Sequence, residues 1–248
     1  MIKAVVFDLD NTLVDFMKMK EASIAAAVDA MVDAGLNMEQ EHARQRIFEI
    51  YEDRGIEYQQ VFDKFLEESH GQIDYRILAA GITGYRRARE SALVSYPHVT
   101  VALVELMKRG LKLAVVSDAP RLQAWTRLCS LGFHNYFDVV VTFEDTHRRK
   151  PAPEPFQKVL EELHLQPDEA IMVGDWAERD IVGARELGML TVFARYGDKF
   201  ATVHSGADFD ITDIRDVVRI VDEQGKGFKD PSPNPGIEPP GTPREPKQ

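Results

Sequence analysis

Two aspartates lie at the end of the first apolar run of the chain, in the stretch VVFDLDNTL. Asp8 and Asp10 are two positions apart, so an extended strand would place both carboxylates on the same side, where they repel one another. A magnesium ion would offset this repulsion, because Mg²⁺ prefers oxygen ligands, usually takes one or two carboxylates and keeps waters that a substrate phosphate can replace. The two aspartates are therefore expected to form part of a magnesium site at the end of this strand.

Further polar groups follow other short apolar runs of the chain. They are Thr12, Ser117, Asp118, Lys150, Asp175 and Asp180. In an open parallel sheet, ligands bind beyond the carboxyl ends of the strands, where segments that are distant in sequence converge. Each of these residues alone is commonly a helix cap, a turn former or a solvated loop residue. Together they supply carboxylates, a hydroxyl and a lysine, a set that turn chemistry does not require, so we expect one shared site.

The elements that position these groups alternate short β-branched runs with longer helical patterns. This order predicts an α/β fold with a doubly wound parallel sheet. We expect strands at residues 3–7, 113–116, 139–142, 171–173 and 191–193, and helices near 100–109, 122–131, 154–163 and 177–187. Glycines follow three of these helices, at Gly110, Gly132 and Gly188, where a left-handed residue ends a helix well.

One long interval breaks this alternation. Residues 17–93 contain no convincing buried strand but show apolar residues at helical spacing, so we expect a small helical bundle inserted as a cap. The catalytic core would then comprise residues 1–16 and 94–222. Residues 223–248 are rich in proline and poor in apolar residues, which predicts a disordered tail.

Composition and charge exclude several classes of protein. The 248 residues carry a net charge of −11, which makes binding to nucleic acid unfavourable. We expect no membrane span and no signal segment, and therefore no membrane partner and a cytoplasmic location. The single cysteine, Cys129, cannot form an internal disulfide and is expected to be a small buried residue.

Four motifs in order, FDLDNTL, VVSDA, the Lys150-Pro151 pair and GDWAERD, resemble those of the haloacid dehalogenase superfamily. The resemblance covers roughly residues 1–222 and implies a Rossmann-like core. It is nearest to the archaeal-type subfamily I phosphatases, which include glyceraldehyde 3-phosphate phosphatase-like proteins. The implied activity is hydrolysis of small-molecule phosphomonoesters through an aspartyl-phosphate.

The resemblance also implies roles for the two aspartates of the first motif. Asp8 would be the nucleophile that attacks phosphorus. Asp10 would protonate the leaving alkoxide and then deprotonate the hydrolytic water, and this acid favours phosphate esters over haloalkanoates, which need no such proton. Asn11 stands where glycine is common in this motif, and asparagine tolerates the same turn geometry.

Phosphate-binding roles fall on other residues of the motifs. Thr12 would support the loop and belongs with the substrate-binding set. Ser117, the backbone N–H of Asp118 and the ammonium of Lys150 would hold the phosphoryl oxygens.

The metal implied by the resemblance is Mg²⁺. Asp8 and Asp175 would bind it through carboxylates and Asp10 through its backbone carbonyl. Asp180 completes the expected metal site, orienting a metal-bound water or Lys150 from outside the ligand shell.

The substrate would be a small phosphorylated metabolite, selected by the cap. Cap residues that could face it are Phe16, Lys18, Lys20, Tyr85, Arg86 and Arg89. Three alternatives remain open at this point: a phosphomutase or phosphotransferase of the same superfamily, a receiver-like phosphoacceptor, and a catalytically silent metabolite-binding subunit. The protein would be a monomer or a homodimer.

Overall fold

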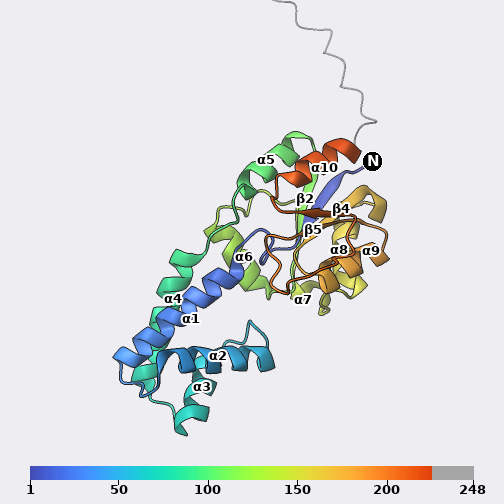
Figure 1. The fold of residues 1–248 in the computed structure, drawn as a ribbon. Coiled ribbons are helices and arrows are strands. Elements are labelled where there is room, and N and C mark those ends of the chain that lie inside the picture. The colour runs from blue at the N-terminus through green and yellow to red at the C-terminus, as the bar shows by residue number, and fades with distance from the viewer. Residues whose placement is uncertain (225–248) are drawn as a thin grey trace, which may run out of the picture.

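A computed structural model describes residues 1–224, which form an α/β core and a separate lobe of helices (Figure 1). The last core helix, α10 (Asp216–Gln224), ends two residues beyond the expected limit of the core at residue 222. The remainder of the proline-rich segment, from residue 225, lies outside the described residues. No helix of the described chain is both long enough and apolar enough to span a bilayer.

The core is built on a parallel sheet of six strands in the order β3-β2-β1-β4-β5-β6. The strands are β1 (Ala4–Phe7), β2 (Lys112–Val116), β3 (Val139–Val141), β4 (Ala170–Gly174), β5 (Leu190–Ala194) and β6 (Phe209–Ile211). The doubly wound parallel sheet predicted from the sequence is confirmed, and only the short edge strand β6 was not expected. Since Phe7 pairs with Val115 of β2 and Val173 of β4, the polar residues after these strands emerge at one edge.

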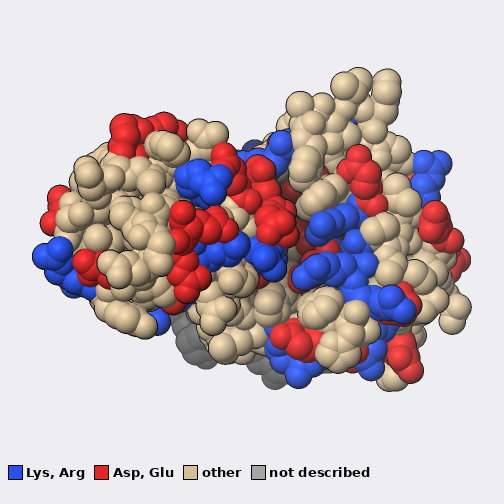
Figure 2. Space-filling model, turned by 90° about the horizontal axis from the view of Figure 1, so that it is seen from below, with Lys and Arg blue, Asp and Glu red and all other residues tan. Residues whose placement is uncertain are grey.

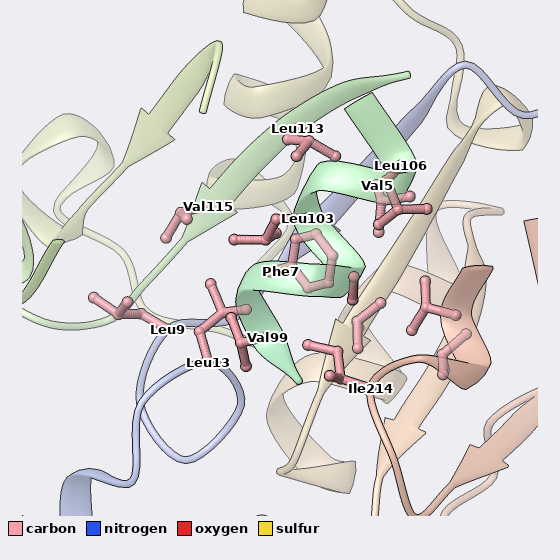
Figure 3. Close-up of a cluster of buried hydrophobic side chains, with 14 of the residues drawn as sticks. Val5, Phe7, Leu9, Leu13, Val99, Leu103, Leu106, Leu113, Val115 and Ile214 are labelled. Atoms are coloured by element: carbon pink, nitrogen blue, oxygen red, sulfur yellow. The ribbon is translucent and has the colours of Figure 1, made fainter. Parts of the chain in front are cut away.

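Both faces of the sheet are covered, which explains why its two central strands, β1 and β4, carry no polar side chain. Val5 and Phe7 of β1 point to the face covered by α5 (Val99–Lys108), where Leu103 lies against Phe7 (Figure 3). Ala4 and Val6 point to the opposite face, covered by α8 (Pro153–Leu163) and α9 (Val182–Glu186). The first strand is therefore held rigidly from all sides.

The other core helices lie close to the ends of the strands. They are α6 (Arg121–Ser130), α7 (Phe143–Thr146) and the 3₁₀ turn Pro167–Glu169. The single helix expected at 177–187 is wrong in detail, because a π-helical turn, Ala177–Ile181, precedes α9. Cys129 on α6 is exposed, so its expected burial is also wrong.

The second lobe consists of four helices with their own apolar core, and we refer to it as the cap. These are α1 (Phe16–Asp33), α2 (Gln40–Arg54), α3 (Val61–His70) and α4 (Tyr75–Ala92). Its core contains Ile24, Val28, Ile47 and Phe65, none of them shared with the sheet. The chain crosses between the lobes at two adjacent places, where Asp15 N donates to Val94 O (3.1 Å). The boundaries 17 and 93 stay a prediction.

Candidate active site

The ammonium of Lys150 lies at the centre of the polar edge of the sheet. Its Nζ donates to Asp8 Oδ1 (2.5 Å) and to the carbonyl of Val116 (3.0 Å), and it lies 2.6 Å from Asp180 Oδ1. The last contact is a buried ion pair. Burial works against the charge of Lys150, but the carboxylates of Asp180 and Asp8 outweigh it and raise its pKa.

Three buried carboxylates gather beside this lysine. One oxygen each from Asp8, Asp175 and Asp180 lie within 4.8 Å of one another. Burial raises the pKa of Asp8 to about 7, against the opposing effect of Lys150, and burial together with the charge of Asp8 raises the pKa of Asp175 well above its ordinary value. Three acids against one lysine leave negative charge uncompensated in a dry site, so these residues fit a hard divalent cation.

Thr12 is attached to this group through Asp175. Its hydroxyl donates to Asp175 Oδ1 (3.0 Å) and is completely buried. This hydrogen bond orients the carboxylate of Asp175, and the place of Thr12 in the substrate-binding set stays a prediction. The same loop is held by Tyr196, whose hydroxyl donates to the carbonyl of Thr12 (3.0 Å).

Asn11 adopts a left-handed conformation, with φ of 63°, as expected for the residue that replaces glycine in this motif. Its side-chain oxygen accepts a hydrogen bond from Met17 N (3.0 Å) at the start of α1. The loop also passes very close to Gly197, where an added Cβ would lie 1.7 Å from the carbonyl oxygen of Asn11. Only glycine therefore fits at position 197.

The residues after β2 lie on the other side of Lys150. The Ser117 hydroxyl is buried and accepts a hydrogen bond from Ala119 N (3.1 Å). Asp118 accepts from the backbone N–H of Lys150 (2.9 Å) and pairs with Arg179 (3.1 Å). The carboxylate of Asp118 therefore holds the lysine-bearing loop in place, which is a function that the sequence did not suggest.

The side chain of Asp10 does not belong to the acidic group. Its Oδ2 accepts from Arg127 Nη1 (2.6 Å), and its Oδ1 is buried without a hydrogen-bond partner. Burial raises the pKa of Asp10 to about 6, although the charge of Arg127 acts in the opposite direction. Whether its backbone carbonyl joins the metal stays a prediction.

A cavity of about 470 Å³ lies between the cap and the core. Five of the six expected cap residues line it, namely Phe16, Lys20, Tyr85, Arg86 and Arg89, whereas Lys18 does not. The acidic group does not line this cavity, but Arg127 does, and the same side chain donates to Asp10. Figure 2 shows basic and acidic side chains side by side in the hollow between the two lobes. Such mixed charge suits a small polar ligand.

Arg127 and Glu57 are among the residues that line this cavity and that sequence reasoning missed. Glu57 carries no signal, since it is one charged residue in a short connection between two helices. Arg127 offers a weak one, because it follows Ala124 at helical spacing on the buried face of α6. A charged residue on such a face requires a partner.

The fold and the site together define a class of α/β enzymes in which a capped, acidic edge of the sheet binds the substrate. Within this class, the chain belongs to the haloacid dehalogenase-like hydrolase family, whose model matches residues 5–194. The resemblance seen in the four motifs is thus confirmed.

Relatives of known name support this assignment. The chain is 37% identical to a glyceraldehyde 3-phosphate phosphatase of Methanocaldococcus jannaschii, over 89% of this chain and 97% of that protein. It is 32% identical to a ribulose-1,5-bisphosphate 5-phosphatase of Halopiger xanaduensis, over 77% and 84%. Among solved structures, a haloacid dehalogenase phosphatase of Thermococcus onnurineus is similar with a TM-score of 0.66 and 28% identity, over 89% and 98%.

Proposed function

We propose that the protein is a magnesium-dependent phosphatase that hydrolyses small phosphomonoesters through an aspartyl-phosphate. The observation that carries this proposal is the contact of the Lys150 ammonium with Asp8, within a group of three buried carboxylates. A lysine and a divalent cation on either side of one carboxylate would allow a dianionic phosphate to approach it. Asp8, Asp175 and Asp180 supply the carboxylates that would hold Mg²⁺, which neutralises charge on the phosphate when bound.

The nucleophile in this scheme is Asp8. Its carboxylate oxygen forms a bond to phosphorus as the ester P–O bond breaks, and the electron pair leaves with the alkoxide. Lys150, Ser117 and the backbone of Asp118 would hold the phosphoryl oxygens. A second displacement by water would then release inorganic phosphate and restore Asp8.

Asp10 would move the protons in both steps. A pKa of about 6 leaves part of this carboxyl protonated near neutrality, so it can donate a proton to the leaving alkoxide. The resulting carboxylate can accept a proton from the attacking water. Its ion pair with Arg127 places it beside the cavity, where the alcohol part of the substrate would lie.

The substrate class follows from the cavity and from the relatives. The cavity is of metabolite size, and the named relatives act on small phosphorylated compounds. We propose glyceraldehyde 3-phosphate as the first compound to test, and a cytoplasmic location, where such metabolites occur. A receiver-like phosphoacceptor does not agree with the family to which the chain belongs.

The test compares the purified protein with its Asp8→Asn variant on p-nitrophenyl phosphate and on a panel of phosphorylated metabolites, with Mg²⁺ and with EDTA. Release of inorganic phosphate is expected only from the unchanged protein with Mg²⁺. Equal rates for the two proteins would rule out the proposed function. A phosphomutase would instead convert a sugar phosphate to its isomer without net release of phosphate.

A further inference from the structure

We propose that Arg127 is a positioning residue that holds the cap over the active site through Glu57 while it orients Asp10. This inference rests on the proposed function, since it assigns a purpose to the cap of that same site. Neither Arg127 nor Glu57 belongs to the four motifs of the chain.

The guanidinium of Arg127 joins two carboxylates from different lobes. Nη1 donates to Asp10 Oδ2 (2.6 Å) in the loop after β1 of the core, and Nη2 donates to Glu57 in the connection between α2 and α3 of the cap. The arginine side chain is only 8% exposed, and the two carboxylates are 21% and 22% exposed. Both contacts are therefore largely shielded from water, where charge-assisted hydrogen bonds are strongest.

This contact is unusual in how it joins the lobes. Within residues 1–224, Arg127–Glu57 is the only ion pair that links residues 17–93 to the rest of the protein. The cap helices pack chiefly on one another, most extensively α1 on α4. Covalently, the cap is attached only by the two adjacent crossings near Asp15 and Val94. The contact between Arg127 and Glu57 therefore opposes a swing of the cap about these crossings.

The chemistry of arginine suits this role better than that of lysine. A planar guanidinium presents separate N–H groups in a fixed fork, so one side chain can serve two carboxylates in fixed directions. The ring of Phe16, at the first residue of α1, lies 4.4 Å from the guanidinium carbon and fixes its plane. An ammonium at this position would serve one carboxylate well and the other poorly.

A coupling between the cap and Asp10 follows from this geometry. When the cap lies over the core, Glu57 holds one side of the guanidinium and keeps the other side on Asp10. When the cap swings away, Glu57 leaves, and Arg127 loses the contact that fixes its orientation. The proton-transferring carboxylate is thus positioned correctly only when the cavity is closed to water.

The kinetic test uses Glu57→Gln, Arg127→Gln and the double variant on a substrate that the unchanged protein hydrolyses. Each single change is expected to lower kcat/KM by roughly tenfold or more, the size of one lost charge-assisted contact. Because both changes break one contact, the double variant is expected to lose no more than Arg127→Gln alone. Arg127→Lys is expected to restore only part of the loss.

Matched controls alter ion pairs that stay within one lobe. Glu49→Gln breaks the pair with Arg46 inside the cap, and Arg121→Gln breaks the pair with Asp145 inside the core. Arg121 lies on the same helix as Arg127. Neither control is expected to change kcat/KM or the position of the cap.

The position of the cap is measured without turnover, by the distance between two spin labels. One label is placed on the natural Cys129, which is exposed on α6 and two residues from Arg127, about 200° around the helix from it. The other is placed at Gln72→Cys, at an exposed position between α3 and α4 of the cap. Glu57→Gln is expected to broaden the distance distribution and shift it to longer values, and the controls are not.

The outcomes separate this inference from the proposed function. An unchanged distance distribution in Glu57→Gln, with unchanged kcat/KM, would overturn the inference even if Asp8→Asn abolishes turnover. The inference would also be overturned if the free-energy losses in kcat/KM of the two single variants added up in the double variant, since the two side chains would then act independently. If Asp8→Asn has no effect, the phosphatase proposal fails, and the label distances still decide whether Arg127 holds the cap.

Discussion

Gly174 lies at the end of β4, and because glycine has no side chain it leaves space beside the active site. The side chain of Asp180 fills this space, and a Cβ added at Gly174 would lie 2.4 Å from its Cβ, Cγ and Oδ2. Ordinary contacts of this kind begin at 3.4 Å. A Gly174→Ala substitution must therefore displace Asp180 by about 1 Å, because the backbone of β4 is held by strands on both sides.

The cost of this displacement can be judged from the contacts of Asp180. Its carboxylate lies 2.6 Å from the ammonium of Lys150 and accepts from Trp176 N (3.0 Å). A shift of this size breaks at least one of these contacts and moves the lysine that faces Asp8. We expect kcat/KM to fall by about 100-fold, a loss that a 1 Å misplacement near a reacting group can cause. Overpacking would lower the free energy of unfolding by about 1–3 kcal/mol.

The assay measures kcat/KM on p-nitrophenyl phosphate with Mg²⁺, and urea denaturation measures the free energy of unfolding. Gly110→Ala is the control, since it strains a left-handed residue at φ of 74° but meets no atom within 4 Å. It is expected to lose about 1 kcal/mol of stability and no activity. A folded Gly174→Ala protein with the full kcat/KM would refute the argument, since Asp180 would then tolerate displacement.

Two further predictions concern buried polar side chains. Thr12→Val removes the hydrogen bond to Asp175, so we expect Mg²⁺ affinity measured by calorimetry to fall about 10- to 100-fold; an unchanged affinity would mean that Thr12 does not orient this carboxylate. Burial lowers the pKa of Lys20 to about 8, so above this pH the unfolded chain binds one more proton than the folded protein. Stability should therefore rise by about 1.4 kcal/mol per pH unit between about pH 8 and 10, and stay level with respect to this group below pH 8. Urea denaturation of Lys20→Met should lack this rise, and the same slope in both proteins would contradict the assignment.

Strands of the core were predictable because their residues are apolar on both faces. Each of the five predicted strands differs from the observed one by one residue at one or both ends. β6 was missed, since its three residues include the exposed Asp210. The helix expected at 177–187 divides because Asp180 turns back to the backbone N–H of Trp176, which the apolar spacing does not reveal.

The four motifs predicted that Asp8, Lys150, Asp175 and Asp180 gather at one edge of the sheet, because the ends of parallel strands meet wherever the strands pair. The tertiary structure alone decided the partners of those residues. The hydroxyl of Thr12 donates to Asp175, and Asp10 accepts a hydrogen bond from Arg127, which is 117 positions away in the sequence. A pairing of this kind depends on how α6 and the cap lie over the sheet, and local spacing contains no record of that arrangement.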